Sequence, residues 1–313
     1  MTPSPLPGSS GPPPKAPQSI GQLTRLVLAY VRREGLAERR TRDWISYMAI
    51  AGALERTGGG GVNAHFALKG GVALELRLNG KARATRDLDL SYRGPATNDL
   101  VEAVAEALKK PYGRFTFERT GKPLDMARVN TLRLDIMVRF SGSHWGTVSI
   151  DVNRGEGAPT DLEMVDAFDI EKEFGLGGPD KLPCLSLHDH MAQKIHGMTL
   201  PPVTPDTPNE RVQDAIDVLL FLDHFDDASA RRRLREACEA TFAARNTHSW
   251  PPTFAPAEIW REDFAAMARD LGLTVGDLDT AERELHQFII DVAHEPAPEV
   301  SADSLDMAEE AGG

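Results

Sequence analysis

Hydrophobic residues along the chain follow two patterns, which predict an α/β part followed by a helical part. Apolar and polar residues alternate along residues 129–140 and 147–153, which predicts two strands with one buried face each. Shorter elements are expected around them: strands at 65–69, 87–92 and 114–119, and helices at 71–78 and 99–110. The mixed order of strands and helices indicates an α/β (α+β) fold class, with a small mixed sheet and helices packed on it.

Helical periodicity dominates on both sides of this segment. A capping box at residues 19–22 starts one helix, and a second helix covers about residues 42–56 and stops at four glycines. From about residue 186 onward five helices are expected, at 187–198, 210–225, 228–245, 256–271 and 275–294.

These patterns divide the chain into four segments: a disordered Pro-rich N-terminus at 1–17, an α/β domain with N-terminal helices at 18–184, a helical domain at 185–295 and a flexible acidic tail at 296–313. The two cysteines, Cys184 and Cys238, fit a reducing compartment rather than a disulfide framework. No apolar run approaches the roughly 20 residues of a membrane span, and the N-terminus lacks a signal-peptide pattern. We therefore expect a cytoplasmic protein with no membrane partner.

The chain is acidic overall, but its charge is unevenly distributed. The formal net charge is −12, and half of it lies in residues 295–313, which hold six acidic residues and no basic one. Residues 109–139 hold eight basic residues against three acidic ones. A local basic face for nucleic acid is thus compatible with the composition. Any single basic cluster is equally typical of a solvated helix or strand face.

The residues most informative about chemistry are Asp87 and Asp89. Strand residues two positions apart point the same way, so these carboxylates are expected side by side, where they suit a divalent cation that carries a triphosphate. They follow a turn made by Lys69, Gly70 and Gly71. A Gly-Gly step that opens a helix lets backbone N–H groups approach a phosphate.

Three residues just before Asp87 can extend such a phosphate site. Thr85 can donate its hydroxyl, and Arg83 and Arg86 can neutralise phosphate charge. The alternative interpretation is a glycine helix cap and an exposed polar strand. It is less favoured, because neighbouring carboxylates repel one another when no cation is present.

A third carboxylate on a neighbouring strand would complete a two-metal site. Asp151 lies on the polar face of the strand expected at 147–153, and Asp135 is its rival on the strand before. Because Arg133 and Arg139 flank Asp135, we interpret Asp135 as an ion-pair partner and favour Asp151 as the metal ligand.

The helical part adds a basic and an acidic candidate. Lys194 lies beside the apolar stripe of the helix expected at 187–198 and can reach a triphosphate across a cleft, although a surface lysine fits the pattern as well. Asp214 and Asp217 share a helix face and can orient Lys194 or act as a base. The alternative is a pair of acids at a helix N-terminus.

Other chemistries are poorly supported. The histidines of the helix expected at 187–198, His188, His190 and His196, are spaced by two, six and eight positions, and we interpret them as ordinary polar residues. The sequence has no Walker A motif, no Gly-x-Ser-x-Gly elbow and no Cys-x-x-Cys pair.

Taken together, residues 66–74, 83–90, 192–196 and 211–217 resemble the AbiEii/AbiGii nucleotidyltransferase toxins, the toxin halves of bacterial toxin–antitoxin and phage-defence systems. The resemblance covers roughly residues 40–225. It implies a DNA polymerase β-like nucleotidyltransferase core in 18–184 and an all-helical C-terminal domain that completes the active site. It also implies an NTP substrate, Mg²⁺ (or Mn²⁺) as cofactor and a cognate antitoxin protein.

Carried over by position, the resemblance implies catalytic roles for Asp87, Asp89, Lys194 and Asp214. Thr85 stands where the family has a Ser or Thr that contacts the nucleotide and, in some members, is phosphorylated by the antitoxin. The residue before Asp214 is glutamine, where the family often has Lys or Arg. The choice between Asp214 and Asp217 therefore stays open.

We thus expect a metal-dependent nucleotidyltransferase that moves a nucleotide from an NTP to an RNA acceptor. In mycobacterial members of the family the acceptor is the 3′ end of tRNA, whose modification blocks aminoacylation and growth. Two alternatives remain: nucleotidyl transfer to a protein or small molecule, and a catalytically silent module that binds nucleotide or antitoxin.

Overall fold

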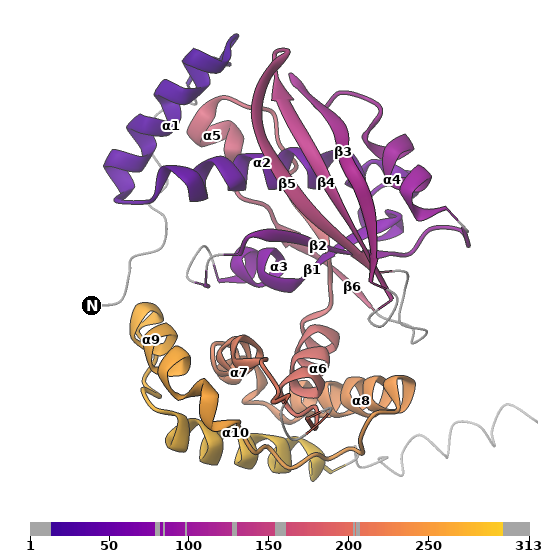
Figure 1. Ribbon diagram of the computed structural model, residues 1–313, viewed down its shortest axis with the longest axis vertical. Coiled ribbons are helices and arrows are strands. Elements are labelled where there is room, and N and C mark those ends of the chain that lie inside the picture. The colour runs from indigo at the N-terminus through magenta and orange to yellow at the C-terminus, as the bar shows by residue number, and fades with distance from the viewer. Residues whose placement is uncertain are drawn as a thin grey trace, which may run out of the picture.

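The computed structural model describes residues 14–78, 82–83, 85–97, 99–126, 130–153, 161–202, 204 and 207–296. Most of the expected Pro-rich N-terminus and nearly all of the expected acidic tail lie outside these residues. The described residues form an α/β half and a helical half, seen in the upper and lower parts of Figure 1. No helix in this part of the chain has the length and apolar character needed to cross a membrane.

A seven-stranded sheet forms the centre of the α/β half. Its strands are β1 (Phe66–Lys69), β2 (Asp87–Tyr92), β3 (Phe115–Met126), β4 (Thr131–Phe140), β5 (Ser143–Asn153), β6 (Leu162–Asp166) and β7 (Lys181–Leu185). Their spatial order is β3-β4-β5-β2-β1-β7-β6. β2 is parallel to β5 and β1 to β7, while the other neighbouring strands are antiparallel. The predicted mixed sheet is therefore confirmed.

The helices of this half are α1 (Ile20–Glu34), α2 (Glu38–Glu55), α3 (Gly70–Arg77), α4 (Leu100–Leu108) and α5 (Ile170–Phe174). The apolar face of β4 and β5, with Leu134, Ile150 and Val152, belongs to one core cluster with the buried faces of α1, α2 and α4. In Figure 1, α2 crosses behind the strands and α4 lies beside β3. Because these helices cover the apolar face, the alternating polar residues of β4 and β5 lie on the opposite face.

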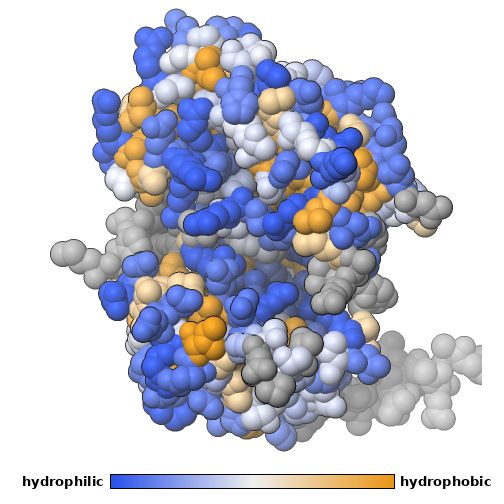
Figure 2. All heavy atoms as spheres, in the orientation of Figure 1, coloured by the Kyte–Doolittle hydropathy of each residue, from blue (hydrophilic) through white to orange (hydrophobic). Residues whose placement is uncertain are grey.

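The helical half consists of α6 (Leu187–Met198), α7 (Val212–Leu219), α8 (Ala228–Arg245), α9 (Arg261–Leu271) and α10 (Leu278–Ala293), with short 3₁₀ turns at Leu222–Phe225 and Glu258–Trp260. These helices share a second core cluster, which also includes Leu74 of α3. α3 is thus the element of the α/β half that packs into the helical core. On the face shown in Figure 2, hydrophilic residues gather along the band where the two halves meet.

Several observed elements differ from the sequence-based ones, mostly at their ends; among these, α7 and α9 are shorter than expected. α2 begins at Glu38, four residues before the predicted start. β3 continues to Met126, well beyond the predicted end at 119, because it pairs with β4 across an irregularity between Thr120 and Leu124. β6, α5 and β7 were not predicted, because five-residue elements carry too little periodicity. Val129 of the expected 129–140 strand lies outside the described residues.

Candidate active site between the sheet and helices α6 and α7

The turn that opens α3 lies against the Asp-x-Asp strand. Lys69 pairs with Asp89 in the antiparallel β1–β2 ladder, so Gly70 follows directly beside Asp89. Gly70 has a φ of +64°, and a Cβ atom built there would lie 1.8 Å from Oδ2 of Asp89. Only glycine therefore allows the backbone to approach this carboxylate so closely.

Thr85 packs against the first turn of α3. A Cβ atom built at Gly71 would lie 2.7 Å from Cβ of Thr85. The Thr85 hydroxyl donates a hydrogen bond of 3.2 Å to the backbone carbonyl of Asp87. Arg86, the next residue along the chain, is exposed. The structure therefore brings the Gly-Gly turn and the residues that precede β2 together.

Three carboxylates gather on β2 and β5. In their parallel register, Asp89 lies opposite Asp151, and Asp87 lies two residues earlier on the same face of β2. Arg133 of β4 joins two of them, donating two hydrogen bonds of 2.7 Å to Asp151 and one of 3.2 Å to Asp87. One guanidinium group thus donates hydrogen bonds to both carboxylates. The two acids therefore point toward a common space in which a positive charge is stabilised.

The electrostatics of these carboxylates favour a bound cation. Burial raises the pKa of Asp89 to about 6, while Lys69 and Lys194 oppose the rise. Burial also raises the pKa of Asp87, against the lowering effect of Arg133, and Asp151 adds repulsion to both acids. Burial and mutual repulsion disfavour the ionised form of these two acids, and a nearby cation would stabilise that form.

The sequence-based interpretation of Asp135 as the partner of its flanking arginines is wrong. Arg133 pairs with Asp151 instead, and Arg139 pairs with an acid of β3. Asp135 is exposed and accepts a hydrogen bond of 2.6 Å from the hydroxyl of Ser149. Strand register explains the difference, because Asp151 lies directly opposite Arg133 in the β4–β5 ladder.

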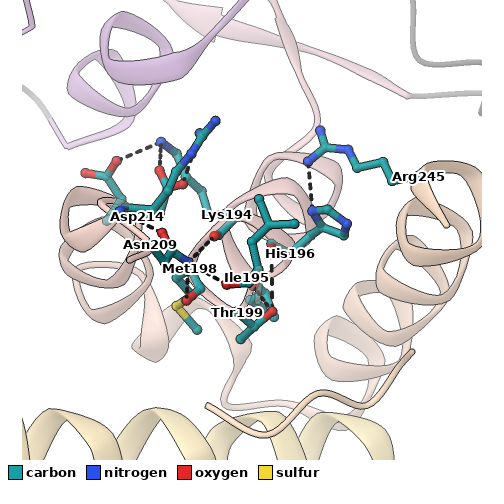
Figure 3. Close-up of polar contacts among 12 residues, drawn as sticks. Lys194, Ile195, His196, Met198, Thr199, Asn209, Asp214 and Arg245 are labelled. Carbon is teal, nitrogen blue, oxygen red and sulfur yellow. Dashed lines mark hydrogen bonds and ion pairs between the residues drawn. The ribbon is translucent and has the colours of Figure 1, made fainter. Parts of the chain in front are cut away.

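Helices α6 and α7 hold a buried lysine between two carboxylates (Figure 3). Nζ of Lys194 donates to Asp214 at 2.7 Å and lies 3.0 Å from a carboxylate oxygen of Asp217. Arg83, from the segment before β2, donates bonds of 3.1 and 3.2 Å to Asp217. Although burial favours the neutral amine, Asp214 and Asp217 raise the pKa of Lys194. Lys194 therefore stays charged, and both of the acids left open by the sequence contact it.

Two residues that bring α6 and α7 together were not singled out from the sequence. A Cβ atom built at Gly197 would lie 2.4 Å from Oδ2 of Asp214, so the two helices pack closely there. The Asn209 side-chain amide donates to the last carbonyls of α6 and the residues after it (Figure 3), those of Gly197, Met198 and Leu200. An isolated glycine three residues after Lys194 was the available signal for this approach.

The two carboxylates at the start of β2 fit a divalent cation. Mg²⁺ is usually bound by one or two carboxylates together with substrate phosphates, and Asp87 and Asp89 supply such a pair. Among the residues that the structure describes, no group of three or more acidic, His or Cys side chains is arranged as a complete cation site. Asp151 is directed at Arg133 instead.

Comparisons with known proteins identify the class of the molecule as a nucleotidyltransferase. More specifically, the chain belongs to the AbiEii family, because the model described as "Nucleotidyl transferase AbiEii toxin, Type IV TA system" matches residues 53–288. Among solved structures it is similar to MenT4, a nucleotidyltransferase toxin from Mycobacterium tuberculosis H37Rv. The TM-score is 0.56 and the identity 18%, with 94% of this chain and 98% of the other covered. No match was found among curated proteins.

The family and the fold settle several expectations. The chain is a nucleotidyltransferase toxin of a type IV toxin–antitoxin system, which implies an NTP substrate and an antitoxin partner. The likeness to MenT4, at 18% identity, supports the fold alone.

Proposed function

We propose that this toxin transfers a nucleotide from an NTP to RNA, at the 3′ end of tRNA, with Mg²⁺ or Mn²⁺ as cofactor. The observation that carries the proposal is the set of ion pairs by which Asp217 joins Arg83, just before the Asp87–Asp89 strand, to Lys194 of the helical half. We further propose that residues 18–184 form the nucleotidyltransferase domain and 185–295 the helical domain that completes the site. A tRNA acceptor would also place the protein in the cytoplasm.

In this proposal the chain binds the triphosphate from two sides. The Gly70-Gly71 turn presents the start of α3, whose first backbone N–H groups are available to phosphate oxygens. Lys194 supplies a fixed positive charge, and Asp214 holds its ammonium group in place at 2.7 Å. Lys69 adds charge from the end of β1, and Arg83 and Arg86 add charge from the segment before β2.

The reaction forms a bond between an acceptor hydroxyl oxygen and the α-phosphorus, and breaks the bond from that phosphorus to the oxygen that leaves with pyrophosphate. A divalent cation held by Asp87 and Asp89 would neutralise charge on the phosphoryl group and orient the attacking oxygen. Asp151 is the third carboxylate beside them, and Arg133 fixes its orientation with two hydrogen bonds. The hydroxyl proton leaves to a carboxylate of this group or to water.

Basic residues next to the sheet support an acidic macromolecule as the acceptor. Between the end of α4 and the middle of β3, five basic side chains are exposed: Lys109, Lys110, Arg114, Arg119 and Lys122. Contacts with phosphates release counterions, so binding of tRNA should weaken steeply as salt rises.

Thr85 is the proposed point of control by the antitoxin. Its hydroxyl lies beside Gly71 and bonds to the Asp87 carbonyl. A phosphate added there would put about two negative charges next to the carboxylates and the triphosphate site, and would repel the nucleotide. Mass spectrometry of the toxin after coexpression with its antitoxin tests this point, and an unmodified Thr85 in neutralised toxin would exclude it.

The function is tested with radiolabelled NTPs. The protein is incubated with each α-labelled NTP, Mg²⁺ and total tRNA, beside Asp87→Ala as the inactive control. Label in tRNA that depends on Asp87 supports the proposal. Label found only in protein or in a small product would show that the acceptor is a protein or a small molecule and not tRNA. No label anywhere, with pyrophosphate release equal to that of Asp87→Ala, would exclude catalysis.

A further inference from the structure

His190 is a buried histidine whose hydrogen-bonding groups are unsatisfied. It lies on α6, one helical turn before Lys194, so the two side chains share a face of the helix. The side chain is 2% exposed, and neither ring nitrogen has a hydrogen-bond partner in the described part of the chain. A neutral imidazole carries one N–H donor and one acceptor, and leaving them unpaired in the interior destabilises the folded protein.

His196 on the same helix provides an internal comparison. Its Nδ1 lies 3.2 Å from Nη1 of Arg245 (Figure 3), and its Nε2 lies 2.8 Å from the hydroxyl of Thr247. The protein thus satisfies both nitrogens of one buried histidine of α6 from its own chain. The lack of partners at His190 is therefore a property of that position, since another buried histidine of the same helix has both.

Positive groups surround His190. Burial lowers the pKa of its ring well below the ordinary value, and four cations add to the effect: Lys194, Arg77, Lys69 and Arg83. The ring is therefore neutral and keeps a single N–H donor. A neutral N–H group near several cations can help to bind an anion, because it donates a hydrogen bond without adding to the repulsion between the cations.

The topology places His190 at the proposed triphosphate end of the site. β1 and β7 are parallel neighbours, with Leu68 opposite Cys184. The carboxyl ends of parallel strands lie at the same edge of a sheet, so the chain leaves β1 into the Gly-Gly start of α3 and leaves β7 into α6 at one edge. The first turns of α6, which carry His190, thus adjoin the glycine turn.

We propose that His190 donates a hydrogen bond from its ring N–H to an oxygen of the terminal phosphates, β or γ, of the bound NTP. The proposal rests on the proposed function and adds a contact that neither the sequence pattern nor the resemblance assigned. Lys194, one helical turn further along the same face, is 12% exposed and therefore reaches the surface of the protein. A nucleotide whose phosphates reach Lys194 and the glycine turn satisfies the donor that the free protein leaves unpaired.

The proposal predicts opposite effects on stability and on binding. His190→Leu removes an unsatisfied polar group, so the free protein should melt at a higher temperature. The same variant should bind NTP about tenfold or more weakly, because a hydrogen bond to a charged phosphate is lost. Binding of the matching NMP, which lacks the β- and γ-phosphates, should stay unchanged. His190→Gln, which keeps an N–H donor, should restore part of the NTP affinity.

The experiment is calorimetric titration of the full chain with NTP and with NMP in the presence of Mg²⁺. His196→Leu is the matched control, since it deletes a buried histidine of the same helix that already has partners. It should lower the melting temperature and leave the ratio of NTP to NMP affinity unchanged. Equal NTP affinity in the original protein and in His190→Leu would overturn the proposal and show that the ring is a packing residue or is bound to water.

A second measurement guards against a misfolded variant. Ring-nitrogen resonances of His190 in the unmodified protein should shift with NTP and not with NMP, and identical spectra with both ligands would overturn the proposal. Failure of the proposed function is distinguishable, because it is measured as absence of label in tRNA, whereas this proposal is measured by the binding of NTP and NMP.

Discussion

The contact between Gly70 and Asp89 yields the sharpest quantitative prediction. In Gly70→Ala, a residue with a side chain must adopt a φ of +64°, which costs about 1–2 kcal/mol of folding free energy. The new Cβ atom would lie 1.8 Å from Oδ2 of Asp89, so the carboxylate or the start of α3 must move. A displacement of about 1 Å in a catalytic constellation costs roughly 100-fold in rate. We therefore expect a modest loss of stability and a loss of nucleotidyl transfer of about that size.

Gly35→Ala is the matched control. Gly35 has a φ of +68°, and a Cβ atom built there would have no atom within 4 Å. Gly35→Ala should also lose about 1–2 kcal/mol of folding free energy, and it should keep full activity. The assay combines urea unfolding with the initial rate of pyrophosphate release. Full activity in Gly70→Ala would refute the close approach of the glycine turn to Asp89, and so would equal activity losses in both variants.

Three further predictions concern other parts of the molecule. Lys194→Met removes the cation that Asp214 and Asp217 share, while Arg83 still pairs with Asp217, so unfolding free energy measured in urea should fall by at most about 3–5 kcal/mol; an unchanged midpoint would contradict the buried pairing. Arg133→Met removes the cation that joins Asp87 and Asp151, so the free protein should melt lower and Mg²⁺ should raise the melting temperature more than in the original protein. An equal Mg²⁺ response in both proteins would argue against a cation at these carboxylates. For His196, burial and then Arg245 lower the folded-state pKa to about 3. Protonation therefore favours the unfolded chain, and the contribution of His196 to stability should be constant above about pH 6.5 and fall below it by up to about 1.4 kcal/mol per pH unit. Urea midpoints between pH 5 and 7.5 test this, and His196→Phe should show a flatter profile than the original protein.

The strongest local patterns were enough to predict the core of the fold. β2 begins and ends where the Asp-x-Asp strand was expected, and α6 and α8 also match their predicted limits. Each of these segments has a clear apolar periodicity, bounded by a cap or a turn. β7 was missed because its five residues, which include Pro183, owe their conformation to pairing with β1 and β6. Pairing of this kind depends on the whole sheet and leaves little trace in a short stretch of sequence.

In the candidate site, too, local sequence patterns indicated some features, while others became visible only in the three-dimensional structure. Asp87, Asp89, Lys194 and Asp214 were singled out as candidates by residue type, spacing and the family resemblance, with Asp217 as the alternative to Asp214. The role of Arg133 depends on the β4–β5 register, which puts Arg133 directly opposite Asp151, with which it pairs. Such a cross-strand pair can be read only once the register is known. His190 passed as an ordinary polar residue because burial without partners is visible only in three dimensions.

The central claim is that the paired carboxylates of β2 act as the catalytic centre of nucleotidyl transfer to tRNA. It is tested most directly by the rate of transfer of an α-labelled nucleotide to tRNA in Asp89→Asn, beside Asp135→Asn. Both changes remove one strand carboxylate, but the Asp135 side chain is exposed and its carboxylate accepts a hydrogen bond from the Ser149 hydroxyl. The account predicts that Asp135→Asn transfers label at nearly the original rate and that Asp89→Asn transfers none above background. Transfer by Asp89→Asn at the original rate would contradict it.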